Sequence, residues 1–365
     1  MRIALLMSAK GWRGSAVSYA KVARGLTERG HLAQVITATP ALTSRLVAER
    51  LPVIEIPGRK TGLREVRALV RALRGLSADA VMVDTPRDLR LAALATLLHR
   101  APIVYRYNLN YRPPRNHLAD RLYGRRVAAC VFQSQFIHET ALRQEPWLRR
   151  VPAYRVANGY DTARFAPGPR AAATFRRKWR IPQDALVVLT SAKLERDKGH
   201  HVAFAALNRV HQETAALIYV VCGNGAREQE LRDLAAAGTL PVCFTGLLDT
   251  DELVGALSAA DVVVHPSLHE IFPNAVGEAM ACARAVVAAD AGGTGELLGR
   301  DGSTGVLVPP NNPDALAQEV SGLLGNPTRR ATLGAAARSR IVSEFSLHRM
   351  IDGYEAALQQ VIGHE

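Results

Sequence analysis

The stretch Glu270-Ile-Phe-Pro-Asn-Ala-Val-Gly-Glu278 joins a buried strand to a helix. The strand, Asp261-Val-Val-Val-His265, is an apolar run typical of a parallel sheet. The helix is predicted to begin near Asn274 and is rich in Ala and Glu. Because ligands in open α/β sheets bind at the carboxyl ends of the strands, Glu270 is expected on a loop at the binding edge. Glu278 is expected about one turn into the helix that follows.

The backbone beside these carboxylates adds donors to the predicted site. The N–H groups of Phe272, Asn274 and Ala275 precede or begin the helix, where they suit a phosphate or a sugar hydroxyl. The two carboxylates accept hydrogen bonds from hydroxyls. A nucleotide sugar needs both kinds of partner, so this stretch predicts a nucleotide-sugar site.

Size and composition indicate a globular protein of two domains. The chain has 365 residues, of which 48% are hydrophobic, and this excludes a disordered chain. Met1–Met7 has too short an apolar run for a signal peptide and is predicted to be the first strand. The cysteines are scattered, which favours reduced thiols. No run is long enough for a membrane span, so a cytoplasmic protein is expected.

The positive charge is concentrated in the first half of the chain. Residues 1–165 hold 28 Lys/Arg and 11 Asp/Glu, a balance of +17. The rest of the chain holds 18 Lys/Arg and 22 Asp/Glu, a balance of −4, so the net charge of the whole chain is +13. The first half is therefore the part expected to meet an anionic partner.

Buried strands alternate with amphipathic helices along the whole chain, which predicts an α/β protein with two doubly wound, Rossmann-like domains facing a central cleft. We predict domains at 1–165 and 166–345, linked by Ala166-Pro-Gly-Pro-Arg170, with the active site between them. The strands are predicted near residues 3–7, 33–37, 53–56, 80–83, 103–107, 128–132, 186–190, 216–221, 242–245, 261–265, 285–289 and 305–308.

With Phe-Pro-Asn inside it and Glu-Ala-Met-Ala at its end, the 270–278 stretch resembles the Glu-x7-Glu motif of the retaining GT-B glycosyltransferases of family four. The resemblance is good from about residue 155 onward and weaker before it. It implies transfer of a sugar from a nucleotide diphosphate to a hydroxyl, with retention. Glu278 would hold the ribose hydroxyls, and Glu270 would lie near the transferred sugar beside Phe272, Pro273 and Asn274. The closing segment, about 346–365, resembles the family helix that packs back on the first domain.

The resemblance also assigns the groups that neutralise the leaving diphosphate. Ala192-Lys193-Leu-Glu-Arg-Asp-Lys198-Gly199 is similar to the family's Gly-Arg-x4-Lys-Gly segment, so Lys193 and Lys198 would stabilise the charge on the departing oxygen. The family's Gly and Arg are Ala192 and Lys193 here. Lysine keeps the charge but loses the bidentate fork of arginine.

Two glycine-rich turns resemble further donor-binding segments. Cys222-Gly223-Asn-Gly225 is similar to the family's Gly-Asp-Gly turn beside the base or ribose. In Ala291-Gly292-Gly293-Thr294, the glycines would let the backbone approach a phosphate, and Thr294 is expected to cap the next helix. His265 is interpreted as a structural residue at the end of its strand.

On the acceptor side, Gly11-Trp-Arg-Gly14-Ser15 resembles the family's glycine-rich first loop, with a plain turn as the alternative. Many members carry a His after the strand near 103–107, where this chain has Arg106-Tyr107-Asn108, so Arg106 or Asn108 would replace it. Asn158-Gly159-Tyr160-Asp161, with Phe165 behind, resembles a hinge signature and is interpreted as mainly structural.

The segment Leu63–Arg74 predicts an amphipathic helix with four arginines on one face, and further arginines follow at positions 112, 115, 121, 125 and 126. We expect this surface to contact an anionic membrane or a phosphorylated lipid-linked glycan, with a solvated helix face as the alternative. Asp249-Thr-Asp251 is interpreted as a helix cap, and neither a metal nor another cofactor is expected.

Other functions stay open at this stage. A GT-B epimerase or sugar phosphorylase would use the same donor site. The changes at Ala192 and Lys193 also fit a non-catalytic subunit that binds a nucleotide sugar or a partner transferase. No nucleic-acid motif or aromatic stacking platform accompanies the basic half, so nucleic-acid binding is not expected. The acceptor fits bacterial surface glycans such as lipopolysaccharide, reached at the inner face of the cell membrane.

Overall fold

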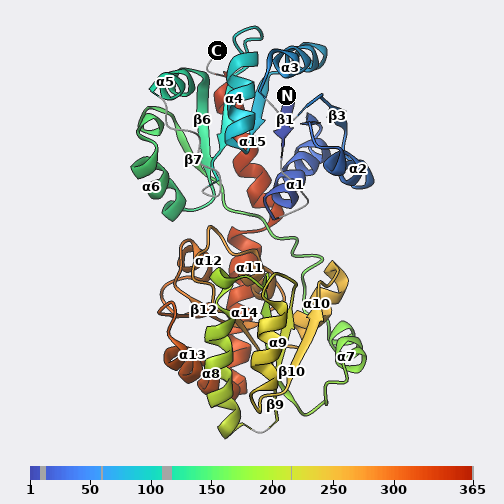
Figure 1. Ribbon diagram of the computed structural model, residues 1–365, viewed down its shortest axis with the longest axis vertical. Coiled ribbons are helices and arrows are strands. Elements are labelled where there is room, and N and C mark those ends of the chain that lie inside the picture. Colours follow the sequence, from blue (N-terminus) through green and yellow to red (C-terminus); the bar gives the residue numbers. More distant parts are fainter. Residues whose placement is uncertain (9–13, 59–60, 109–116, 215, 364–365) are drawn as a thin grey trace. The chain divides into compact units, whose positions relative to one another are not determined.

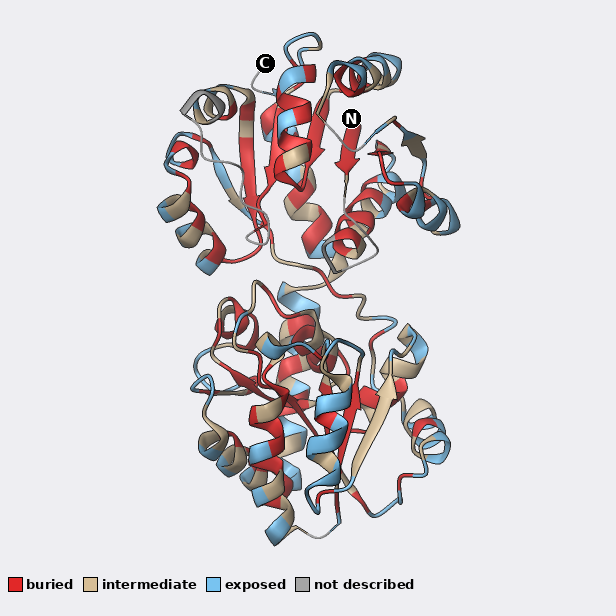
Figure 2. Ribbon diagram, in the orientation of Figure 1, coloured by how far each residue is buried: buried red, intermediate tan, exposed pale blue. Residues whose placement is uncertain are grey.

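The computed structural model describes residues 1–8, 14–58, 61–108, 117–214 and 216–363. The chain divides into two compact units (Figure 1). Unit 1 comprises Met1–Gly159 and Leu347–Glu365, and unit 2 comprises Tyr160–Ser346. Each unit is built around its own parallel sheet, with its own buried core (Figure 2).

The sheet of unit 1 has the strand order β3-β2-β1-β4-β5-β6-β7, with all neighbours parallel. Both faces are covered by helices, which explains why its central strands are nearly continuous apolar runs. The strands are β1 (Arg2–Met7), β2 (Leu32–Thr37), β3 (Val53–Glu55), β4 (Ala80–Val83), β5 (Ile103–Arg106), β6 (Val127–Phe132) and β7 (Ala153–Arg155).

The helices of unit 1 form two layers. On one face α1 packs against α15, and on the other α3 packs against α4 and α4 against α5. They are α1 (Gly14–Glu28), α2 (Pro40–Ala48), α3 (Leu63–Leu76), α4 (Pro86–Ala95), α5 (His117–Arg126), α6 (Gln135–Gln144), the short 3-10 helix η1 (Pro146–Arg150) and α15 (Leu347–Gly363).

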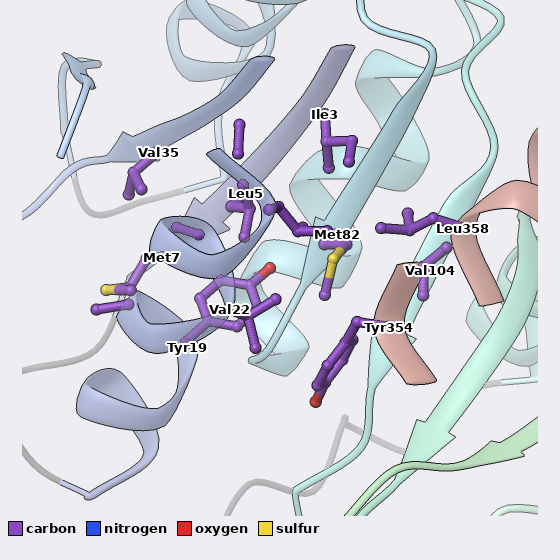
Figure 3. Close-up of a cluster of buried hydrophobic side chains, with 14 of the residues drawn as sticks. Ile3, Leu5, Met7, Tyr19, Val22, Val35, Met82, Val104, Tyr354 and Leu358 are labelled. Carbon is purple, nitrogen blue, oxygen red and sulfur yellow. The ribbon is translucent and has the colours of Figure 1, made fainter. Parts of the chain in front are cut away.

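The core under α1 and α15 ties the end of the chain to unit 1. Figure 3 shows Tyr354 and Leu358 of α15 in the same cluster as Tyr19 of α1 and Met82 of β4. Gly25 makes the close helix contact possible, because a Cβ there would lie 2.4 Å from Ile351. The amphipathic last helix therefore stabilises the first sheet by burying its apolar side against it.

The sheet of unit 2 has the order β10-β9-β8-β11-β12-β13, again entirely parallel. Its strands are β8 (Leu186–Ser191), β9 (Leu217–Cys222), β10 (Val242–Gly246), β11 (Val262–His265), β12 (Ala285–Ala289) and β13 (Val306–Val308). Its helices are α7 (Pro169–Lys178), η2 (Arg196–Lys198), α8 (His200–Glu213), α9 (Glu228–Ala236), α10 (Thr250–Ala259), α11 (Asn274–Ala281), α12 (Thr294–Leu298), α13 (Pro313–Leu324) and α14 (Pro327–Glu344).

The strands predicted from apolar runs are all present, and β7 is an additional one. It is a three-residue edge strand, Ala-Tyr-Arg, that pairs with β6 through Cys130 and Ala153. Its residues are not buried, so its sequence contains no apolar run from which the strand could be predicted. Backbone pairing to a strong neighbour, rather than side-chain pattern, defines this strand.

The units divide earlier in the chain than the predicted linker. Tyr160 already belongs to unit 2, where its N–H donates to Phe345 O at 2.9 Å. Arg338 of α14 also donates to Phe165 O at 3.0 Å. Residues 166–170 therefore lie inside unit 2, where Pro169 begins α7. Among the described residues no helix is long and apolar enough to cross a membrane.

Candidate active site

The loops that follow β8 and β11 are held together by their backbones. Gly199 has φ +66°, and a Cβ there would lie 2.0 Å from Pro266 O, so glycine is required for this approach. Leu268 N–H donates to Asp197 O at 2.7 Å, and Ser267 Oγ donates to the same oxygen at 3.3 Å. Because β8 and β11 are neighbours, these bonds place both loops at one point of the sheet edge.

This loop pairing brings two of the predicted catalytic groups, Lys198 and Glu270, into contact. Lys198 Nζ donates to Glu270 Oε1 at 2.8 Å, and His265 Nε2 lies 2.9 Å from the same oxygen. His265 is the last residue of β11, which fixes its ring beside the loop. All three side chains are largely buried. The carboxylate thus sits between two nitrogen groups at the carboxyl end of the sheet.

The surroundings of Glu270 keep it ionised. Burial alone would raise the pKa of its carboxyl, but the hydrogen bond and charge of His265, followed by those of Lys198, outweigh that effect and lower the pKa to about 2. Glu270 is consequently an acceptor of hydrogen bonds at every pH near neutrality. It is not suited to act as a general acid.

The helix that carries Glu278 is seated on a buried tyrosine. A Cβ at Gly277 would lie 2.0 Å from Cζ of Tyr160, and the Tyr160 hydroxyl donates to Pro273 O at 3.4 Å. Burial, then the charges of Glu278 and Glu270, raise the pKa of Tyr160 well above its usual value. Tyr160 therefore lies near both carboxylates and fixes the start of α11.

Two of the predicted backbone donors, Asn274 and Ala275, lie at the beginning of α11, and their contact with a ligand stays a prediction. Pro273 precedes the helix, and Asn274 and Ala275 are its first two residues. Phe272 is buried, with its ring 5.8 Å from that of Phe345, so its side chain anchors the loop from inside unit 2. The start of α11 at Asn274 is confirmed.

The glycines of the turn after β9 serve a second loop contact. A Cβ at Gly223 would lie 2.0 Å from Ala192 O, and one at Gly225 would lie 2.5 Å from Leu194 O. The two loops also exchange a hydrogen bond, from Leu194 N–H to Asn224 O at 2.9 Å. Gly223 and Gly225 thus allow the loop that carries the lysines to pack against its neighbour.

Lys193 is on that loop but apart from Glu270. Its side chain is 48% exposed, and Nζ lies 3.4 Å from Glu195 Oε1. Its carbonyl contacts Nε2 of the buried His200 at 2.9 Å. Burial lowers the pKa of His200 to about 4, so this ring is neutral and belongs to the loop scaffold. Of the two predicted lysines, the structure brings only Lys198 to the carboxylate.

The turn after β12 differs from the prediction in one detail. Gly292 has φ +56°, as a tight turn requires, but Gly293 is the residue that precedes α12. Thr294 is the first helical residue, and its buried hydroxyl donates to Ala291 O at 2.7 Å. The prediction that Thr294 caps this helix was wrong, because its hydroxyl closes the turn before the helix instead.

The predicted acceptor residues belong to unit 1. Gly11 lies outside the described residues, and Gly14 and Ser15 begin α1. Asn108 is buried two residues beyond the end of β5. Arg106 is 1% exposed and donates to Asp84 Oδ1 at 3.1 Å and to Ser18 Oγ at 3.0 Å. The structure therefore gives Arg106 a structural role inside unit 1, and its contact with an acceptor stays a prediction.

Asp249 caps α10, as predicted. Its side chain accepts from Glu252 N–H at 2.9 Å, and the Glu252 carboxylate accepts from Asp249 N–H at 3.4 Å. This reciprocal pair is a capping box. Within the described residues no group of His, Cys, Asp and Glu is arranged to hold a metal ion.

Comparison with known proteins bears on this arrangement. A family described as glycosyl transferases group 1 matches residues 172–340, and one described as glycosyltransferase family 4 matches residues 12–164. Alpha-maltose-1-phosphate synthase of Mycolicibacterium smegmatis is 30% identical over 321 residues, which cover 77% of this chain and 81% of that protein. The chain belongs to the group 1 glycosyltransferases of the family-four type.

Other relatives of this group 1 glycosyltransferase match part of its length. Glycogen synthase of Mycobacterium tuberculosis is 34% identical over 192 residues, which cover 52% of this chain but only 44% of that protein. Among solved structures, Anabaena Alr3699/HepE in complex with UDP has a TM-score of 0.86 at 23% identity and covers 99% of this chain and 100% of its own. The same protein with UDP-glucose has a TM-score of 0.83 at 22% identity, over 98% and 99% of the two chains. These structures establish the GT-B fold.

Sequence reasoning missed two residues of this glycosyltransferase site. His265 was interpreted as structural, and its contact with Glu270 depends on the path of the loop between them. Tyr160 was interpreted as mainly structural within the hinge signature, and its ring supports α11, but its position beside the two carboxylates was not predicted. The one available signal was Gly277, because a glycine inside an Ala-rich helix indicates a close approach by another group.

Proposed function

We propose that this protein transfers a sugar from a nucleotide-diphosphate sugar to a hydroxyl of a glycan or lipid-linked acceptor, with retention of configuration. The observation that carries the proposal is the hydrogen-bonded pair of Lys198 and Glu270, adjacent to the helix of Glu278, in a chain of the group 1 family. A lysine and an ionised carboxylate at one sheet edge suit the diphosphate and the sugar of such a donor.

Lys198 is the group that meets the diphosphate. Breaking the bond between the sugar and the phosphate places negative charge on the departing oxygen, and a preorganised cation stabilises it. Because Nζ is already held at a fixed position by Glu270, little reorganisation is needed when the donor binds. Lys193 lies on the same loop and would add a second, more mobile charge.

Glu270 and Glu278 are the groups that meet hydroxyls. Glu270 stays ionised through His265 and Lys198, so it can accept hydrogen bonds from the transferred sugar. We assign Glu278, in the second turn of α11, to the ribose hydroxyls. The beginning of α11 and the Gly292-Gly293 turn offer backbone N–H groups to the phosphates.

The proposed reaction forms a bond between the acceptor oxygen and the anomeric carbon and breaks the bond to the diphosphate oxygen. The acceptor proton passes to the departing phosphate on the same face of the sugar, which preserves the configuration. Neither a metal ion nor another cofactor enters this scheme. Lys198 supplies the charge compensation that a divalent cation would otherwise provide.

The binding of UDP and UDP-glucose by the Anabaena relative supports a nucleotide-diphosphate hexose as donor, with UDP-glucose as the first candidate. The +17 balance of residues 1–165 supports an anionic acceptor. We propose a lipopolysaccharide or another cell-surface glycan, modified in the cytoplasm at the inner face of the cell membrane, which the protein contacts peripherally.

Release of the free nucleotide from a panel of UDP-, GDP- and ADP-sugars tests the reaction, measured with and without lipid-linked glycan acceptors. Acceptor-dependent release, abolished in Lys198→Ala, is the expected result. NMR of the product then reports the anomeric configuration. Release without acceptor would indicate a hydrolase, and turnover of the sugar nucleotide without release would indicate an epimerase.

A further inference from the structure

The three helices on one face of unit 1 carry an outer surface of arginines. On α3 the arginines 64, 67, 71 and 74 are exposed, whereas the one acidic residue of the helix, Glu65, is buried and accepts from Gly62 N–H. The neighbouring helices add exposed Arg90, Arg121 and Arg125. Because α3, α4 and α5 pack side by side, these charges share one side of the sheet (Figure 1).

Among the described residues, no ion pair involves any of the exposed arginines of α3, α4 and α5. The opposite face of unit 1 is built differently. There Arg24 pairs with Glu49 at 2.7 Å, and Arg29 pairs with Asp352 and Glu355 at 2.7 and 2.6 Å. Arg24 and Arg29 are therefore paired with acids, whereas the exposed arginines of α3, α4 and α5 form no ion pair with a described residue.

Exposed leucines lie among these charges. Leu97 and Leu98, in the turn that follows α4, are 57% and 60% exposed, and Leu94 on α4 is also exposed. The turn is held from two sides, since Arg74 of α3 donates to Leu98 O at 3.2 Å and Arg126 of α5 donates to Thr96 O. The leucines are thus fixed outward by two of the helices that carry the arginines.

Unit 1 has two hollows lined by arginines, and one of them includes His99 and Arg100, which follow the leucine turn. One, of about 370 Å³, is lined in part by Arg2, Arg74 and Arg100. Asp79 also lines this hollow and forms an ion pair with Arg2. The other, of about 470 Å³, is lined by Arg121, Arg125 and Arg150, together with Asp120, Gly124 and Trp147. Each hollow offers several guanidinium groups to a small anion such as a phosphate.

We propose that this arginine–leucine face, meaning the exposed arginines of α3, α4 and α5 together with Leu94, Leu97 and Leu98, binds the surface of an anionic lipid bilayer. Guanidinium groups contact the phosphates of the headgroups, and the leucines enter the interface between headgroups and acyl chains. This inference names the surface for the membrane contact in the proposed function and rests on it for that setting. Its test requires no donor and no turnover.

The leucines decide between a bilayer and a nucleic acid. Protein surfaces that bind nucleic acids rely mainly on phosphate contacts and on aromatic stacking with the bases. Binding to an anionic bilayer is strengthened by both arginines and leucines, because the burial of apolar side chains adds to the electrostatic attraction. The sequence predicted the arginines of α3, but the leucine turn became evident only from its exposed position beside them.

Sedimentation of the full chain with vesicles of phosphatidylcholine, with and without about one third phosphatidylglycerol, tests the proposal. Binding is expected for the anionic vesicles, with loss at high salt. R64Q/R67Q/R71Q should weaken it at least about tenfold. R170Q/R177Q/R180Q is the matched control, because it removes three exposed arginines from unit 2, none of them in an ion pair with a described residue.

The leucines need their own pair of variants. L97S/L98S should weaken binding to anionic vesicles severalfold, whereas L234S/L247S, which removes two exposed leucines of unit 2, should not. Unchanged melting temperatures show that each variant folds. No binding to anionic vesicles, equal binding to neutral ones, or an arginine effect without a leucine effect would each overturn the proposal. The last outcome would indicate electrostatic attraction to the headgroups alone, without entry of the leucines. Failure of sugar transfer alone would leave vesicle binding intact.

Discussion

Nζ of Lys198 lies 2.8 Å from Oε1 of Glu270, although the two residues come from loops that follow different strands. The contact depends on Gly199, because only a residue without a side chain lets the first loop rest on Pro266 of the second. The lysine thereby acquires a fixed position and the carboxylate a fixed charge. These are the two properties that the proposed reaction requires.

The two lysines of the β8 loop should differ in their contribution to turnover. Lys198→Ala removes a buried, positioned cation and should lower kcat/KM by about a hundredfold or more. Lys193→Ala removes a half-exposed cation and should change it by only about fivefold. Steady-state nucleotide release measures both variants under the same conditions. Equal losses would show that Lys198 has no privileged role.

Glu270 should produce a specific dependence of stability on pH. Its pKa is lowered from 4.5 to about 2 on folding, so the ionised form stabilises the native state above pH 4.5, and this contribution is lost as the pH falls toward 2. Glu270→Gln lacks the contribution. The difference in unfolding free energy between wild type and Glu270→Gln should therefore shrink from pH 5 to pH 3 in urea titrations. A constant difference would contradict the lowered pKa.

The packing of Tyr160 on Gly277 should be visible in a double-mutant cycle. Gly277→Ala places a methyl group inside the tyrosine ring and should destabilise unit 2 by about 1–3 kcal/mol, with weaker donor binding because α11 must move. Tyr160→Leu removes the ring atoms that the methyl group meets. The double variant should therefore be more stable than Gly277→Ala would be if the two effects simply added. Additive free energies would contradict the contact.

Arg106 should affect the stability of unit 1 more than acceptor affinity. Its charge is buried with Asp84, so Arg106→Ala leaves an unpaired carboxylate and should cost about 3–5 kcal/mol. Arg106→Leu combined with Asp84→Leu should recover much of this loss. Chemical unfolding measures both. A variant that folds normally but has a raised KM for the acceptor would restore the interpretation of Arg106 as an acceptor ligand.

The sequence was informative where local pattern determines structure. Apolar runs located the long strands, and the Pro-Asn junction located the beginning of α11 at Asn274. The edge strand β7 has no such pattern, because its pairing with β6 and not its side chains defines it. The same limit applies to Thr294, because its hydroxyl donates to the carbonyl of Ala291 in the turn and does not cap the helix.

The candidate site was predictable in its residue types and less so in its contacts. The Glu270–Glu278 spacing and Lys198 follow from the motif, but the bond between Lys198 and Glu270 depends on how two loops pack. The same holds for Arg106, whose burial results from contacts with Ser18 and Asp84, distant in sequence. Long-range packing of this kind leaves no periodic signal in one sequence.

Thermal melting with candidate donors tests the central claim most directly. Wild type and Glu278→Gln are heated with UDP-, GDP- and ADP-sugars at about millimolar concentration, because a ligand that binds the native state raises the melting temperature by mass action. A nucleotide-sugar enzyme should show a selective rise with one donor, and the rise should be smaller in Glu278→Gln. No rise with any donor, or an equal rise in both proteins, would contradict the donor site described at Glu270 and Glu278.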